Sequence, residues 1–120
     1  MDEIKSFRDL KIWGKAILLV KEIYKLTNSF PTNEAYGLTQ QIRRAVISIP
    51  SNIAEGYGRN STQDYIRFLR ISKGSLYEVI AQLEIAVALD YLESNDTISI
   101  NMLCTELDKM IQSMINKILK

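Results

Sequence analysis

The sequence contains no histidine, and it has one cysteine and two prolines among 120 residues. Histidine is the side chain that most often serves as a general acid or base and as a metal ligand. The single cysteine, Cys104, cannot form an internal disulfide, and with no histidine beside it a zinc site is not expected. We therefore predict a protein that is not an enzyme and that holds no metal or cofactor.

Long apolar runs are also missing. No stretch of about 18 or more apolar residues occurs, so we expect no transmembrane helix and no membrane partner. The N-terminal residues Met1–Lys5 are acidic and lack the apolar segment of a signal peptide. These features predict a cytoplasmic protein.

A strong excess of charge of one sign is absent from the whole chain, whose net charge is +1. The charge is nevertheless unevenly distributed. Residues 31–73 hold six basic and three acidic residues, whereas residues 74–120 hold three basic and seven acidic ones. The basic residues of the middle segment are mostly arginines, which suit both phosphate binding and ion pairs at interfaces. The gradient is compatible with a nucleic-acid surface or with head-to-tail subunit contacts.

The apolar residues recur at helical spacing over most of the chain, and no strand pattern competes with them. A chain of 120 residues is one domain by length. We predict an all-α domain over residues 1–120, an up-down-up-down antiparallel four-helix bundle. Asp9 and Thr32 are the expected caps of the first two helices. The expected helices span residues of about 9–28, 33–57, 62–92 and 97–119.

Apolar residues occupy more of each helix than one buried face requires. Leu18 and Leu19 lie off the predicted core face of the first helix, whose positions are Leu10, Trp13, Ile17, Val20, Tyr24 and Thr27. The third helix is similarly apolar on a second side, beyond its predicted core positions Tyr65, Leu69, Ser72, Leu76, Val79, Leu83 and Ala86. A second burial surface in so short a chain points to another subunit, so we predict a homo-oligomer. The core positions expected in the fourth helix are Ile100, Leu103, Leu107, Met110, Met114 and Ile118.

Pro50 lies inside the second predicted helix. The apolar spacing continues in phase across it, which favours a kinked but continuous helix. The core positions that follow this spacing are Leu38, Ile42, Ala45, Ile49 and Ile53. The alternative is a true break, with Ser48 as the cap of a new helix. Asn52 and Glu55 are expected to satisfy backbone groups near the kink. In the third helix Gly74 costs about 1 kcal/mol relative to alanine, which suggests close approach of a neighbouring helix.

Several basic residues are candidates for nucleic-acid contact. Arg67 and Arg70 share a face of the third helix, with Lys73 and Tyr77 alongside, and such a stripe can bind phosphates and stack a base. The alternative is a solvated face in which Asp64 pairs with Arg67. Arg59 precedes the third helix, where an anion could bind.

Arg43 and Arg44 lie on different sides of the second helix. Each is placed on a small or polar strip between apolar faces. We favour a subunit interface for both, with an acidic partner from a neighbouring chain, and direct RNA contact is the alternative.

The central segment resembles a known family. Its most specific part is the run Ile-Pro-Ser-Asn-Ile-Ala-Glu-Gly at residues 49–56, and Tyr36-Gly37-Leu38, Phe30-Pro31 and Gly74-Ser75-Leu76 also agree. The chain is similar to the 23S rRNA-intervening-sequence proteins over roughly residues 7–93. Ser72 departs from the alanine that is more common in the family.

The resemblance implies a bacterial four-helix bundle that assembles into a ring-like homopentamer without established enzymatic activity. A related branch serves diversity-generating retroelements, where a basic pentamer engages nucleic acid and a reverse transcriptase. We expect a non-enzymatic, homo-oligomeric protein that binds RNA or DNA through its arginines. The alternative is a scaffold that binds a partner protein without contacting nucleic acid.

Overall fold

Four long amphipathic segments of this sequence form α-helices, because each buries one apolar face against the others. The computed structural model describes residues 3–120. Its α-helices are α1 (Lys11–Thr27), α2 (Leu38–Tyr57), α3 (Thr62–Ala88) and α4 (Ile98–Leu119), and its short 3-10 helices are η1 (Phe7–Asp9), η2 (Thr32–Glu34) and η3 (Ser94–Thr97). No strand occurs in this part of the chain, which confirms the prediction of an all-α fold with four helices.

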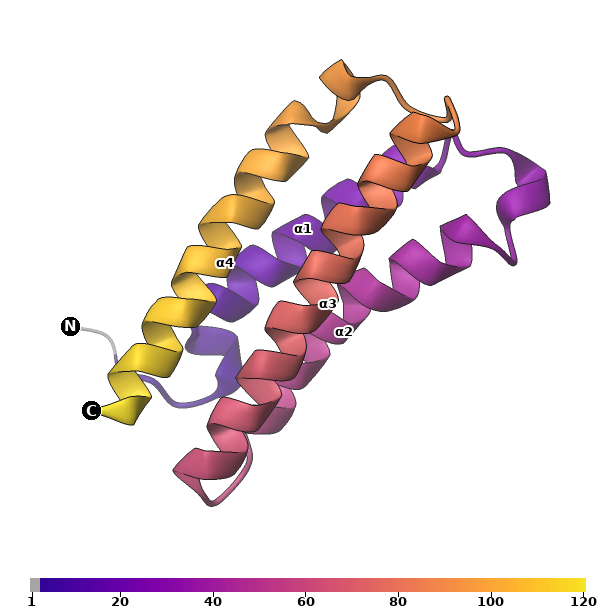
Figure 1. Cartoon of the computed structure of the whole chain (residues 1–120). Coiled ribbons are helices and arrows are strands. Elements are labelled where there is room, and N and C mark those ends of the chain that lie inside the picture. Colours follow the sequence, from indigo (N-terminus) through magenta and orange to yellow (C-terminus); the bar gives the residue numbers. More distant parts are fainter. Residues whose placement is uncertain (1–2) are drawn as a thin grey trace.

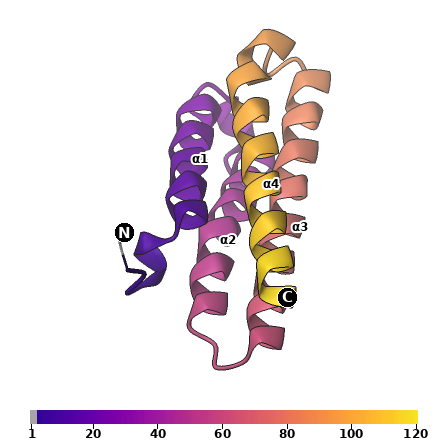
Figure 2. The same cartoon turned by 90° about the vertical axis from the view of Figure 1, so that its left-hand side faces the viewer.

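The four helices lie side by side along the longest dimension of a molecule that measures 44 × 25 × 21 Å. Figures 1 and 2 show the turn between α2 and α3 at one end and the connections from α1 to α2 and from α3 to α4 at the other. The most extensive packing joins α2 to α3, and α4 contacts both α1 and α3. The α2–α3 turn therefore stands apart from the other two connections.

The core of α2 and α3 follows the predicted spacing. Ile42, Ile49 and Ile53 of α2 and Leu69 and Leu76 of α3 are completely buried. In both helices the buried stripe is the one that the apolar spacing predicts, so the sequence is sufficient to orient them.

The buried stripe of α1 differs from the predicted one. The helix buries Ile12, Ala16, Leu19, Ile23 and Thr27, of which only Thr27 is a predicted core position. The predicted core residues Trp13, Val20 and Tyr24 are only partly buried, while Leu18 is 45% exposed. The Phe7 ring of η1 packs on Trp13 with ring centroids 5.2 Å apart. Part of the second stripe is thus covered by a short helix that the apolar spacing does not predict.

The fourth helix is also rotated relative to the prediction. Ile100 and Leu107 are buried as expected, but Cys104, Ile111 and Ile115 complete the core stripe. The other predicted core residues, Leu103, Met110, Met114 and Ile118, are partly buried around it. Cys104 is only 1% exposed, and this burial raises the pKa of its thiol to about 11. The thiol is a small core group.

The first two helices begin later than predicted. Asp9 belongs to η1, where its Oδ2 atom accepts hydrogen bonds from the backbone N–H groups of Lys5 and Ser6 at 2.8 and 3.1 Å. It does not cap α1, because the extended backbone of Leu10 separates the two helices. Thr32 lies in η2, and the start of α2 is instead satisfied by a carboxylate from outside the helix.

That carboxylate belongs to Glu34. Its Oε1 atom accepts a hydrogen bond from the Leu38 N–H at 3.1 Å, and its Oε2 atom accepts one from the Tyr91 hydroxyl at 2.6 Å. Both bonds favour the ionised form, and they hold the pKa of Glu34 below its ordinary value, with the Tyr91 bond contributing most. One side chain therefore links the start of α2 to the segment after α3. α3 ends at Ala88, before the left-handed backbone of Asp90.

α2 runs without interruption through Pro50, so the alternative of a new helix capped by Ser48 is wrong. A bend at Pro50 stays a prediction. Around this position the two central helices exchange polar contacts. The Ser72 hydroxyl of α3 donates to the Ile49 carbonyl at 3.0 Å, and the Ser75 hydroxyl donates to the Ser48 hydroxyl at 2.9 Å. The Asn52 amide donates to the Ser48 carbonyl at 2.8 Å.

The close approach expected at Gly74 does not occur within the chain. Gly74 is exposed, and a Cβ atom there would meet nothing within 4 Å. The close approach lies at Gly56, where a Cβ atom would come within 2.9 Å of the Phe68 Cβ and 3.2 Å of the Tyr65 carbonyl oxygen. Gly56 lets the last turn of α2 lie directly against the first turns of α3.

Candidate nucleic-acid interface

The turn between α2 and α3 gathers arginines at one end of the molecule. α2 ends at Tyr57, and the Ser61 hydroxyl caps α3 by accepting a hydrogen bond from the Asp64 N–H at 3.0 Å. Arg59 lies in this turn, and Arg67 and Arg70 follow on α3. All three are exposed. We call them the arginine surface.

The Phe68 ring organises two of these arginines. The guanidinium carbons of Arg59 and Arg67 lie 4.8 and 4.7 Å from its centroid. Such contacts at exposed sites contribute roughly 0.5–1 kcal/mol each. The ring therefore restricts both guanidinium groups while leaving them accessible to solvent.

Each of these two arginines has an acidic neighbour one helical turn earlier in the sequence. Arg59 pairs with Glu55 at 2.8 Å, whereas the Arg67 Nε atom is 3.7 Å from the Asp64 carboxylate. The second distance is too long for a hydrogen bond. Exposed ion pairs of this kind contribute little to stability, so an arriving phosphate can compete with either carboxylate.

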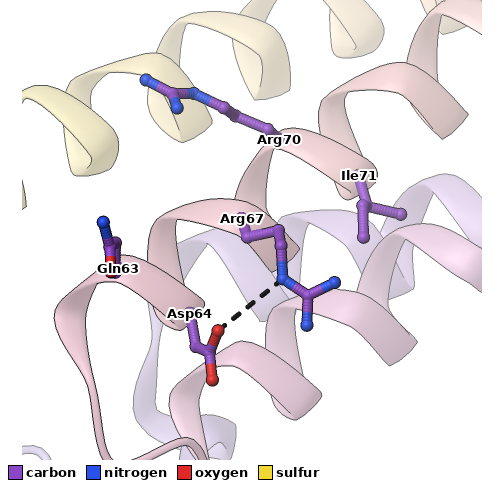
Figure 3. A pocket seen from close by; sticks show the side chains of 5 residues that line it. All are labelled: Gln63, Asp64, Arg67, Arg70 and Ile71. Atoms are coloured by element: carbon purple, nitrogen blue, oxygen red, sulfur yellow. Dashed lines mark ion pairs between the residues drawn. The ribbon is translucent and has the colours of Figure 1, made fainter.

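An open hollow of about 620 Å³ lies beside Arg67 and Arg70. It is lined by Gln63, Asp64, Arg67, Arg70 and Ile71. Figure 3 shows Arg67 turned toward Asp64, whereas Arg70 extends away from both of them. The hollow thus combines two positive groups, a carboxylate, an amide and an aliphatic side chain.

Lys73 and Tyr77, predicted to extend the same stripe, contact α4 instead. The Lys73 ammonium donates to the Gln112 amide oxygen at 2.6 Å and lies 3.5 Å from an Asp108 oxygen. The Tyr77 hydroxyl donates to the other Asp108 oxygen at 2.7 Å. This bond raises the pKa of Tyr77 above its ordinary value. Their polar atoms hold α3 to α4, so we base the candidate interface on the arginine surface alone.

Arg43 also makes its contacts within the chain. Its Nε atom donates to the Thr27 hydroxyl at 2.9 Å, and its Nη2 atom donates to the Asn28 side chain at 3.2 Å. Its guanidinium carbon lies 4.5 Å from the Tyr24 ring centroid. Arg43 therefore fastens α2 to the end of α1. Arg44 lies elsewhere on α2, and the subunit interface predicted for it stays a prediction.

The other predicted structural residues occupy different places. Pro50 is buried, Asn52 is half-buried beside it and Gly74 is exposed on α3. Glu55 bonds to Arg59 and not to the backbone near Pro50. Only Glu55 among them adjoins the arginine surface.

Phe68 is the residue of this region that the sequence did not indicate as functional. Its neighbour Arg67 is adjacent in sequence, but Arg59 reaches it only because the short turn reverses the chain. Helical spacing does not extend across such a turn. Ile71 and Gln63 also line the hollow. The sequence gave no indication of a functional role for either, apart from their position on the same helix as the arginines.

No cluster of acidic, cysteine or histidine side chains suited to a metal ion occurs among residues 3–120. Over the same residues, none of the helices combines the length and apolar character that a membrane crossing requires.

Comparison with known proteins gives a consistent result. A family model described as 23S rRNA-intervening sequence protein matches residues 8–113. A solved structure of a protein of unknown function from the S23 ribosomal protein family of Bacteroides thetaiotaomicron is 27% identical in sequence, with a TM-score of 0.77. That match covers 87% of this chain and 97% of the other. No curated protein matches the sequence.

Proposed function

Because the chain belongs to the 23S rRNA-intervening sequence protein family, we propose that it binds RNA through the arginine surface at the α2–α3 turn. The proposal also takes the protein to be non-enzymatic, cytoplasmic and homo-oligomeric. The observation that carries the proposal is the grouping of Arg59, Arg67 and Arg70, exposed and partly ordered by Phe68, at one end of the molecule.

The charge of one chain is too small for strong binding to a polyanion, since the net charge is only +1. The local positive charge of the arginine surface, repeated in each subunit of an oligomer, can supply the missing affinity. An oligomer would present one arginine surface per subunit, and linked sites bind a long ligand far more tightly than single ones. We therefore propose an up-down-up-down bundle, kinked at Pro50, that assembles as a pentamer. The pentamer is the state that the family resemblance implies.

A non-enzymatic role is supported by the composition of the chain, which contains no histidine. In the α2 segment that carries Ser51, Asn52 and Glu55, the Asn52 amide is already bonded to Ser48 and the Glu55 carboxylate to Arg59. Neither side chain is positioned to activate a serine.

A protein-binding scaffold is the second candidate function. It is favoured by apolar side chains on the surface of α1 and α4, where Leu18 is 45% and Met102 is 68% exposed. A hollow of about 390 Å³ lies between these helices beside both residues. Binding there would depend on apolar contact and would respond weakly to salt.

Fluorescence anisotropy with single-stranded and structured RNA at several salt concentrations tests the proposal. We expect the wild type to bind with a steep salt dependence. The double variant Arg67→Ala/Arg70→Ala should bind more weakly. Its plot of log K against log salt should be less steep, by about 0.7–0.9 in slope for each phosphate that the variant no longer neutralises.

The matched control is Lys11→Ala/Lys21→Ala, which removes the same charge from exposed positions on α1. It should retain most of the affinity and the slope. Equal reductions in both double variants would show that RNA responds to net charge and not to the arginine surface. If no RNA binds at low salt, the first proposal fails and the scaffold remains.

A further inference from the structure

We infer that the hollow beside Arg67 and Arg70 binds one unpaired guanine of the RNA, with Asp64 reading the Watson–Crick edge of the base. This inference rests on the proposed RNA binding and adds a base preference to it. Its basis is the combination of groups around one open concavity.

The hollow is open to solvent, and all five of its lining side chains project from α3. A base can therefore lie against these side chains while its sugar and phosphate stay at the rim. The lining is mixed, since Ile71 supplies apolar surface and is 41% exposed. Single-stranded RNA is recognised in this way, through splayed bases whose faces and edges are both contacted.

Asp64 is the group that distinguishes this hollow from a simple phosphate site. A carboxylate repels phosphate, but an ionised carboxylate offers only acceptors and can pair with two neighbouring donors. The side chain of Asp64 is 45% exposed, and its one charged neighbour among the described residues, Arg67, is 3.7 Å away. The carboxylate is therefore open to a second partner.

Guanine is the base that fits a carboxylate best. Its Watson–Crick edge presents the ring N1–H and the exocyclic amino group as adjacent donors, which match the two carboxylate oxygens. Adenine and cytosine place an acceptor nitrogen beside their amino group, and uracil places carbonyl oxygens beside its N–H. Each of these three would set an acceptor against a carboxylate oxygen.

The arginines would hold the remaining parts of the same nucleotide. Arg70 extends away from Asp64 and is exposed, so it can reach a backbone phosphate. The Arg67 guanidinium is ordered by Phe68 at 4.7 Å and offers a flat cationic surface on which a base can stack. Gln63 is the further polar group beside the hollow.

The test compares short single-stranded uridine oligonucleotides that carry one central guanosine, adenosine, cytidine or inosine. We expect the guanosine form to bind about tenfold more tightly than the others, the contribution typical of a hydrogen bond to a charged group. Inosine keeps N1–H but lacks the amino group, so it should lose most of the advantage.

In the variant Asp64→Asn the ratio of affinities for the guanosine and adenosine oligonucleotides should fall to about one, while the helices stay intact. Since removal of a negative charge raises affinity for all RNA, the readout is the ratio between guanosine and adenosine oligonucleotides. Glu84→Gln is the matched control, because it removes the same charge from an exposed position far along α3. It should keep the ratio of the wild type.

The outcomes separate the two proposals. Salt-sensitive binding that ignores the central base, or a preference that survives in Asp64→Asn, overturns the guanine site while RNA binding stands. Absence of binding by every oligonucleotide at low salt overturns the guanine site, and absence of binding by structured RNA as well overturns both. A preference for guanosine that disappears only in Asp64→Asn supports the site.

Discussion

Gly56 and Gly74 have opposite surroundings although both lie inside long helices. A Cβ at Gly56 would come within 2.9 Å of the Phe68 Cβ, whereas a Cβ at Gly74 would meet nothing within 4 Å. We predict that Gly56→Ala destabilises the chain by about 1–3 kcal/mol through overpacking. Gly74→Ala should stabilise it by about 1 kcal/mol through helix propensity. Urea unfolding followed by circular dichroism measures both free energies of unfolding.

A destabilising Gly74→Ala would contradict this expectation for the single chain. Light-scattering mass of the same variant then separates two causes. A smaller particle would place a helix of a neighbouring subunit against Gly74, whereas an unchanged mass would mean that the monomer itself requires the glycine.

Among individual residues, the sequence proposed the arginines as candidates and gave the pairing of Arg67 with Asp64 as the alternative, and the structure contains that pair. The sequence did not indicate Phe68, which contacts Arg59 across a turn. It also grouped Lys73 and Tyr77 with the arginines, although both bond to α4. A helical repeat shows which residues share a face, but it does not show which other helix covers that face.

Between elements, the Glu34 carboxylate joins the start of α2 to Tyr91 after α3. The folded protein lowers the pKa of Glu34 from its ordinary value of 4.5. The Tyr91 bond to the ionised Glu34 carboxylate therefore stabilises the fold at pH values above the ordinary pKa. Its contribution is lost as the pH falls through the lowered pKa of the folded protein. We predict that Tyr91→Phe lowers the urea midpoint at neutral pH and that this difference shrinks in acid.

Tyr36→Phe is the control, because Tyr36 is 92% exposed and lies in the same region of the chain. It should leave the midpoint unchanged at both pH values. A Tyr91→Phe deficit that is equally large in acid would mean that the hydroxyl acts through packing and not through the carboxylate.

The prediction of helix faces succeeded for α2 and α3, was correct in part for α4 and largely failed for α1, where the reason is identifiable. α1 contains two apolar stripes of the same spacing, one through Ile12 and Leu19 and one through Trp13 and Val20. Spacing alone gives no reason to prefer either. The structure buries the first, and it covers Trp13 with the Phe7 ring. That choice depends on packing between elements, which periodicity does not contain.

For the whole molecule, the exposed apolar side chains of α3 support assembly. Ile85 near the end of this helix and Leu89 just after it are 47% and 49% exposed. We predict that light scattering at micromolar concentration returns a mass several times the 13.8 kDa of one chain. Ile85→Glu should lower that mass without a decrease in helical signal, since the side chain contributes little to the core of one subunit.

Leu119→Glu is the matched control, because Leu119 is 59% exposed at the end of α4. It should leave the mass unchanged. A wild-type mass of 13.8 kDa would contradict the assembly and remove the multivalent part of the RNA-binding proposal.

The serine contacts between α2 and α3 also set the lengthwise register of this pair. Apolar stripes alone tolerate sliding of one helix by a repeat, because one aliphatic side chain can replace another. The Ser72 hydroxyl, completely buried, finds the Ile49 carbonyl at only one offset. Any other offset would lose this bond between the helices and leave the hydroxyl to the carbonyl one turn back in its own helix, at a cost of about 0.5–1.5 kcal/mol. The same bonds therefore fix how Arg59, just after the end of α2, meets Phe68 on α3.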